Sequence, residues 1–328
     1  MNKLIFVIVL MASFNVFSTE GAYEINQACV ASGCFPGDTA GFPVILTEEG
    51  YYKLTSDLTL SENSQGGISI QADNIIIDLQ GHAIKGVNEC TGVYQDCLHL
   101  ANEGSGIGIG LNTITNSTVK NGSIIGTGTI GIHLGNNCQI ENINTQHVVR
   151  AGITVGSGCV ISNSKSSYIS DLGIQTGASV IKDSSVSHIG QYALAIGNSI
   201  IRNVMVFNNT GTGVYDWYGS SIVNSKIYSN GLGIWSANGG TSINDSIINN
   251  NVGVGVHHLN GSAFDALSVP LTIKGNTINL NNGGSDNAQF GGAGSIIELG
   301  TNFCGRDIGS MKIEESILTS FHLLIGRS

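Results

Sequence analysis

Short strands with alternating apolar and polar side chains recur along the chain at intervals of 20 or 21 residues. Each begins with a small residue followed by an apolar one, and the clearest pairs are Gly131-Ile132, Gly152-Ile153, Gly173-Ile174, Ala193-Leu194, Gly213-Val214, Gly233-Ile234 and Gly253-Val254. Alternation with a period of two predicts β-strands rather than helices. Because no repeat can bury its apolar side chains alone, each repeat is expected to stack on the next.

Two further columns of residues keep the same interval. The first consists of Asn and Asp residues, each two positions after an isoleucine: Asn142, Asn163, Asp183, Asn203, Asn224 and Asp245. We expect a buried ladder of hydrogen-bonded amides here, because stacked amides bond along a ladder and Asn tolerates the left-handed conformation of tight turns. The second column contains small residues that should point inward: Cys138, Cys159, Ser179, Ser199, Ser220 and Thr241.

These columns predict an all-β fold, a single right-handed parallel β-helix of roughly ten coils of about 20 residues. The right-handed sense follows the general preference of parallel crossovers. The predicted organisation is an N-terminal cap and lead-in over 19–66, a parallel β-helix over 67–305 and a C-terminal cap or tail over 306–328. Apolar residues of that tail, such as Met311 and Ile317, are loosely helix-spaced, which indicates a capping helix over the open end of the solenoid.

The first 18 residues are typical of a signal peptide, with Lys3 before the apolar stretch Leu4–Leu10. Val16 and Ser18 occupy the −3 and −1 positions of a cleavage site. We therefore expect a secreted protein, extracellular or periplasmic, with no integral membrane span, because no other stretch approaches the ~20 apolar residues that a span needs.

Composition narrows the function classes. Glycine is abundant at 46 residues, proline is rare at 3 and charged residues make up 11%, which is unlike a disordered chain. The net charge of −10 argues against nucleic acid as a partner.

Seven cysteines in an exported chain make disulfides available. Local bridges are expected between Cys29 and Cys34 and between Cys90 and Cys97. Cys138 and Cys159 would lie one coil apart, within the range that a disulfide permits. Two free buried thiols are the favoured interpretation of that pair, and a disulfide is the alternative.

The segment Asn74-Ile-Ile-Ile-Asp78-Leu-Gln-Gly81-His82 resembles the first coil of bacterial secreted proteins with parallel β-helix repeats. The columns resemble the repeats of the pectate-lyase-like superfamily over roughly residues 25–305. The resemblance implies the fold, but it implies no single activity, because that superfamily holds lyases, hydrolases, epimerases and adhesins. It also implies that the small-apolar strand is the first of each coil, with a substrate groove along the outside of its sheet.

The outward column of that first sheet is expected to be His133, Thr154, Gln175, Ala195, Tyr215, Trp235 and Gly255. Loops after it supply Asp216, Trp217, Tyr218, His257 and His258, and turns before it supply Arg150 and Asp171. Exposed aromatic patches usually mark binding sites, so we predict a ligand-binding face centred on Tyr215, Trp217, Tyr218 and Trp235.

Carbohydrate binding is the function that this face favours, with a polysaccharide or surface glycan as the partner of a monomer. A polysaccharide lyase or glycoside hydrolase is an alternative, although hydrolysis needs two carboxylates and alternation points Asp216 inward. A structural or adhesive solenoid is a third hypothesis. No cofactor and no metal ion are expected, since the pair His257-His258 alone is a weak metal signal.

Overall fold

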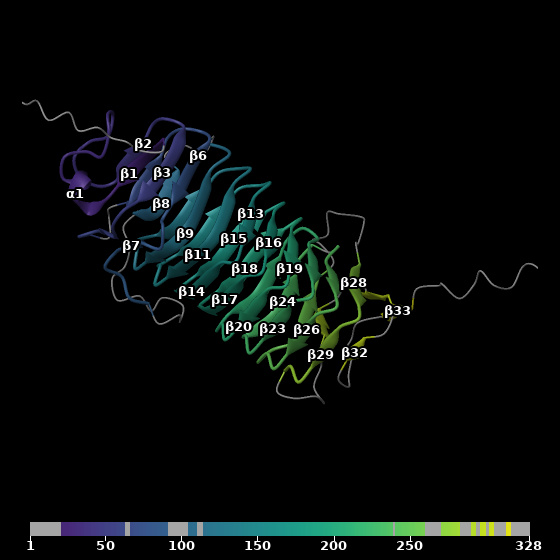
Figure 1. The fold of residues 1–328 in the computed structure, drawn as a ribbon. Coiled ribbons are helices and arrows are strands. Elements are labelled where there is room, and N and C mark those ends of the chain that lie inside the picture. The colour runs from purple at the N-terminus through teal and green to yellow at the C-terminus, as the bar shows by residue number, and fades with distance from the viewer. Residues whose placement is uncertain are drawn as a thin grey trace, which may run out of the picture.

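The computed structural model describes residues 21–62, 66–90, 104–109, 114–238, 240–259, 270–282, 290–292, 296–299, 302–304 and 313–315. Over these residues the chain winds as a parallel β-solenoid, with one short helix, α1 (Gln27–Val30), at the N-terminal end (Figure 1). Its strands form two sheets, of 11 and 22 strands. The all-β solenoid predicted from the repeats is therefore confirmed.

Each coil contributes one strand to the first sheet and up to two strands to the second. The 11-stranded sheet consists of β2 (Val44–Leu46), β5 (Ile68–Ile70), β8 (Ser105–Ile109), β10 (Ile130–Leu134), β12 (Ala151–Val155), β15 (Leu172–Gly177), β18 (Tyr192–Gly197), β21 (Thr212–Asp216), β24 (Leu232–Ser236), β27 (Val256–His258) and β30 (Phe290–Gly292). The 22-stranded sheet consists of β1 (Ala22–Ile25), β3 (Gly50–Leu54), β4 (Leu58–Thr59), β6 (Ile75–Asp78), β7 (Ala83–Lys85), β9 (Thr118–Ile125), β11 (Gln139–Gln146), β13 (Val160–Ser162), β14 (Lys165–Ile169), β16 (Val180–Lys182), β17 (Ser185–Ile189), β19 (Ile200–Arg202), β20 (Met205–Phe207), β22 (Ser221–Val223), β23 (Lys226–Tyr228), β25 (Ser242–Asn244), β26 (Ile247–Asn249), β28 (Leu271–Lys274), β29 (Thr277–Asn279), β31 (Ile296–Glu298), β32 (Phe303–Cys304) and β33 (Ile313–Glu315).

The small-apolar pairs stack in parallel, as the repeat interval predicts. Their apolar members pair in the order Ile132, Ile153, Ile174, Leu194, Val214 and Ile234. Ile234 then pairs with Val256 and not with Val254, because the coil that follows β24 is two residues longer than the coil before it. The predicted register is thus confirmed from Gly131 to Gly233 and wrong for the pair at Gly253.

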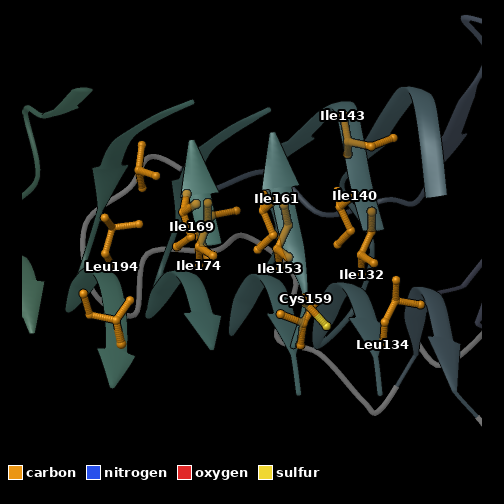
Figure 2. Packing of buried hydrophobic residues seen from close by; sticks show 14 of the residues in the cluster. Ile132, Leu134, Ile140, Ile143, Ile153, Cys159, Ile161, Ile169, Ile174 and Leu194 are labelled. Carbon is orange, nitrogen blue, oxygen red and sulfur yellow. The ribbon is translucent and has the colours of Figure 1, made fainter. Parts of the chain in front are cut away.

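Aliphatic side chains from both sheets fill the interior of the solenoid. Figure 2 shows Ile153 of one sheet beside Ile161 of the other, and both are fully buried. Burying a side chain of this size stabilises the fold by about 1.5–3 kcal/mol. Because every coil repeats the same contacts, the core is a continuous stack along the axis.

The Asn and Asp column occupies left-handed turns but does not form a buried ladder. Its six residues have φ angles of 49° to 54°, so the predicted backbone conformation is confirmed. All six side chains are exposed, although Asn203 Nδ2 donates to Asp183 Oδ1 at 2.7 Å. The prediction of burial is wrong because a left-handed residue at this bend directs its side chain to solvent.

A buried amide ladder lies six residues after the last three members of this column, at Asn209, Asn230 and Asn251, and it continues to Asn281 on the next coil. Asn209 Nδ2 donates to Asn230 Oδ1 at 2.7 Å, and Asn230 Nδ2 donates to Asn251 Oδ1 at 2.9 Å. Backbone amides of the ladder donate to the same oxygens. Each side chain therefore ties its own coil to the next.

The column of small residues points inward, as predicted. The backbone amide of Ser179 donates to Ser199 Oγ at 3.2 Å, and that of Ser199 donates to Ser220 Oγ at 3.1 Å. Cys138 and Cys159 belong to the same column and form a disulfide, so the favoured interpretation of two free thiols is wrong. Stacking brings their Cα atoms to 4.4 Å, which is within bridging distance.

The other predicted bridges lie near the N-terminal end. The Cys29–Cys34 disulfide is confirmed. Cys90 is also disulfide-bonded, while Cys97, its expected partner, lies outside the described residues.

The two ends of the chain are described in part. The lead-in is continuous with the solenoid, since β2 pairs with β5 and β3 pairs with β6. At the other end β33 pairs with β31 in parallel, so Ile313–Glu315 form a strand rather than part of the predicted capping helix. The remainder of 306–328 and the signal peptide over 1–18 lie outside the described residues. In the part of the chain that is described, no helix has the length and apolar character needed to cross a bilayer.

Candidate functional site

The outer face of the 11-stranded sheet carries the column on which the sequence places a binding face. Strand pairing aligns His133, Thr154, Gln175, Ala195, Tyr215, Trp235 and His257. Neighbouring inward residues such as Val214 and Ile234 are fully buried, which fixes the alternation. His257 takes the place predicted for Gly255, because of the two-residue shift after β24.

Five ring-bearing side chains form a continuous band on this face: Tyr192, Tyr215, Trp217, Trp235 and His257, here called the aromatic strip. Tyr192 stacks on Tyr215 with centroids 4.7 Å apart, and Tyr215 meets Trp235 edge-on at 5.3 Å. Trp235 meets His257 at 5.9 Å with perpendicular rings. All five are half-buried, so the strip still presents ring surface to solvent.

Trp217 joins the strip by lying over the preceding coil. A Cβ added at Gly197 would lie 2.5 Å from Trp217 Nε1, so only glycine admits the indole at that position. Ala195, also small, packs with Tyr192 and Trp217 in an apolar cluster separate from the core of the solenoid. Tyr215 contacts Trp217 at 5.8 Å between centroids. The indole is therefore seated by two small residues of the neighbouring coil.

Three titratable residues, here called the charged pole, border the strip: His133, Arg150 and Asp171. Burial raises the pKa of Asp171, and nearby Arg150 opposes that rise. Burial also lowers the pKa of His133, and Arg150 lowers it further. The charged pole therefore combines an imidazole that is shifted toward its neutral form with the side chains of Arg150 and Asp171.

Asp216 and His258, both predicted to contribute to the outer face, lie inside the coil. Each is fully buried. Asp216 accepts hydrogen bonds from the Ser220 amide at 2.7 Å and from Thr241 Oγ1 at 2.6 Å. Thr241 Oγ1 and His258 Nδ1 both lie within hydrogen-bond distance of Ser236 Oγ, at 2.7 and 3.1 Å. The prediction is corrected for these two residues, because alternation along β21 and β27 turns them inward.

Tyr218 is exposed and lies apart from the strip. Its side chain is 60% accessible, and within the described residues it makes no ring contact with any member of the strip. The strip contains instead Tyr192, which the sequence analysis missed. Tyr192 replaces the aliphatic residues of equivalent position on earlier coils, Ala151 and Leu172, and that change of residue type is the signal that could have found it.

Polar atoms on this face retain hydrogen-bonding capacity. Thr154 Oγ1, Asp171 Oδ1 and Trp235 Nε1 are buried and have no hydrogen-bond partner among the described residues. An unsatisfied buried group costs roughly 1–3 kcal/mol. A ligand or water molecule that reached between these side chains would recover that free energy. In the described part of the chain, no three His, Cys, Asp or Glu side chains are grouped so as to hold a metal ion.

Solved structures of similar fold include two epimerases and a polysaccharide lyase. The A-module of the Azotobacter vinelandii mannuronan C-5 epimerase AlgE4 matches with 13% identity and a TM-score of 0.55, over 91% of this chain and 96% of that one. The periplasmic alginate epimerase AlgG matches with 12% identity and a TM-score of 0.57, over 86% of this chain and 83% of that one. A mannuronic acid specific family 6 lyase from human gut microbiota matches with 12% identity and a TM-score of 0.51, over 89% and 82%.

At these identities the similarity shows the fold alone. No protein-family model and no curated protein matches the sequence. The parallel β-helix predicted from the repeats is thus shared with proteins that process polysaccharides, while the activity of this chain has to be argued from its own residues.

Proposed function

We propose that the protein binds a glycan on the outer face of the 11-stranded sheet, through the aromatic strip. The observation that carries the proposal is the unbroken ring contact from Tyr192 to His257 on a sheet surface that is still partly exposed. Rings on the outside of a flat sheet cannot bury themselves in the core, and exposed apolar patches usually mark binding sites. Ring faces stack on the apolar faces of sugars in the same way as on other flat, weakly polar surfaces.

Two further observations support the proposal. The solved structures with this fold include epimerases and a lyase whose titles name alginate, mannuronan or mannuronic acid as what they act on. The Cys29–Cys34 and Cys138–Cys159 disulfides favour an oxidising compartment, where a polysaccharide of the cell surface is accessible. A secreted or periplasmic location is part of the proposal.

Replacing Trp235 with alanine tests the proposal. Aromatic stacking on a nucleobase contributes about 1–3 kcal/mol, and a similar figure for a sugar gives a roughly ten- to hundredfold loss of affinity. The matched control is Phe207→Ala, which removes one ring of the stacked pair Phe207 and Tyr228 on the other sheet. Binding to a polysaccharide panel is measured by affinity electrophoresis and calorimetry. Equal affinity in the two variants would contradict a site at the strip.

Bond cleavage at the charged pole is a second candidate function. His133, kept uncharged by burial and by Arg150, could accept a proton from a bound sugar. Arg150 could pair with a sugar carboxylate. Hydrolysis by a pair of carboxylates has less support, because the aromatic strip and the charged pole together contain one carboxylate, that of Asp171. Formation of unsaturated sugar ends from alginate, abolished by His133→Ala, would establish the lyase activity.

A further inference from the structure

The 11-stranded sheet is almost free of charged residues. Its strands, all of which are described, contain no Lys, Arg or Glu. Their one carboxylate, Asp216, is buried inside the coil and accepts four hydrogen bonds. The two histidines of the outer column are held toward the neutral form, since burial lowers the pKa of both His133 and His257.

The cations of the solenoid lie on the other sheet. In the described ranges, every Lys and Arg except Arg150 lies on a strand of the 22-stranded sheet: Lys53, Lys85, Lys120, Lys165, Lys182, Arg202, Lys226 and Lys274. At the edge of the strip the cation Arg150 lies near the carboxylate of Asp171, which offsets its charge. The whole chain has a net charge of −10, so its long-range field repels anionic polymers.

A carboxylated glycan would bind this face at a cost. Each carboxylate brought against an apolar, uncharged surface loses hydration, and that loss is recovered only where a cation or several donors replace the water. The strip offers no cation between Tyr192 and His257. The Trp235 indole N–H is neutral, and so are the Thr154 hydroxyl and the Gln175 amide further along the outer column. Neutral donors and acceptors of this kind match sugar hydroxyl groups.

We propose that the glycan bound by the aromatic strip is an uncharged, hydroxyl-rich polymer, unlike the acidic polymers named in the titles of the structural neighbours. The inference rests on the proposed glycan-binding function and names the substrate class of that same site. On this inference the chain shares the fold of its structural neighbours but binds a polymer without the acidic groups of the polymers that their titles name. Rings along the strip contact the apolar sugar faces, and the neutral polar groups contact the hydroxyls.

The test compares a polymer that carries carboxylates with its form in which each carboxylate is reduced to a hydroxymethyl group. Alginate and carboxyl-reduced alginate share one backbone, and a panel of neutral hexans and N-acetylhexosamine polymers extends the comparison. Affinities are measured for the full chain, for Trp235→Ala and for the control Phe207→Ala, at about 50 and about 500 mM salt, where the screening length differs several-fold. A gain-of-charge variant, Gln175→Arg, places a cation in the outer column between Thr154 and Ala195.

We expect a neutral polymer to bind, with affinity that falls at least about tenfold in Trp235→Ala and changes less than about twofold with salt. Carboxyl-reduced alginate should bind at least about tenfold more tightly than alginate, and Gln175→Arg should narrow that gap at low salt. Trp235-dependent binding that is tighter for alginate than for its reduced form would overturn this inference and leave the proposed function standing. If no polymer shows Trp235-dependent binding, the proposed function is refuted and this inference with it.

Discussion

Replacing Asn230 with leucine removes the middle of the buried amide ladder while nearly preserving side-chain volume. Asn230 Oδ1 accepts from the Asn209 side chain at 2.7 Å and from the Asn209 backbone amide at 3.3 Å. Asn230 Nδ2 donates to Asn251 Oδ1 at 2.9 Å and to the Val206 carbonyl at 3.2 Å. Leucine can neither accept nor donate these hydrogen bonds. The partner groups are buried, so water cannot take the place of the lost amide.

The expected loss follows from the two donors that Asn209 keeps without an acceptor. Each unsatisfied buried group costs about 1–3 kcal/mol, so the free energy of unfolding should fall by roughly 2–6 kcal/mol. Urea unfolding followed by circular dichroism measures the total loss in free energy of unfolding. Because stacked repeats can open separately, hydrogen exchange at the Asn209 amide should also accelerate more than exchange at distant coils.

Asn203→Gly is the matched control. Asn203 is exposed at φ 54°, a conformation that glycine adopts without strain, so the free energy of unfolding should change by less than about 0.5 kcal/mol. If both variants lost equal stability, or if Asn230→Leu lost less than about 1 kcal/mol, the buried ladder would not be a stabilising element of the solenoid.

Three more outcomes follow from the structure. Gly197→Val should displace the Trp217 indole, seen as a shift in tryptophan fluorescence, and should weaken glycan binding with little change in melting temperature. Burial holds the pKa of Asp171 above 3.8, so its ionised form destabilises the folded state; Asp171→Asn should therefore raise the melting temperature near pH 7, and the gain should vanish as the pH falls below 3.8. Replacing Cys138 and Cys159 together with alanine opens a bridge of sequence separation 21 and should cost about 3 kcal/mol in urea unfolding.

Much of the fold could be predicted because a solenoid is nearly one-dimensional. Residues one interval apart become neighbours, so the spacing from Gly131 to Gly233 gives the strand register directly. What could not be predicted was which polar column turns inward. Asn203 and Asn209 are the same residue type six positions apart, and only the left-handed backbone at Asn203 separates the exposed column from the buried one.

Most members of the candidate face were predicted from the sequence, but Tyr192 and the contacts that join neighbouring coils were missed. Tyr215 and Trp235 follow from the period-two pattern. Trp217 reaches the strip only because Gly197, on the preceding coil, lacks a side chain, and no spacing rule encodes that contact. His257 was placed beside Trp235 by the longer coil after β24, a length change that local pattern cannot align.

The core beneath the strip differs from the core elsewhere, and the difference bears on binding. One inward column of the 11-stranded sheet is apolar at Leu134, Val155 and Ile196 and polar at Thr176. Beneath Tyr215, Trp235 and His257 it carries Asp216, Ser236 and His258. Hydrogen bonds through Thr241 connect these three residues. A buried network of this kind rigidifies its surroundings, so the rings above it are held in place before a ligand arrives.

Rings that are already ordered lose little conformational freedom on binding, and more of their contact energy therefore becomes affinity. We expect the aliphatic core, the inward network and the amide ladder to hold these coils together when an outer ring is removed. Loss of one outer ring should accordingly lower affinity far more than it lowers the melting temperature. The comparison of Trp235→Ala with Phe207→Ala requires that both variants stay folded. Loss of binding in a variant that unfolded would reflect disruption of the core and not of the binding face.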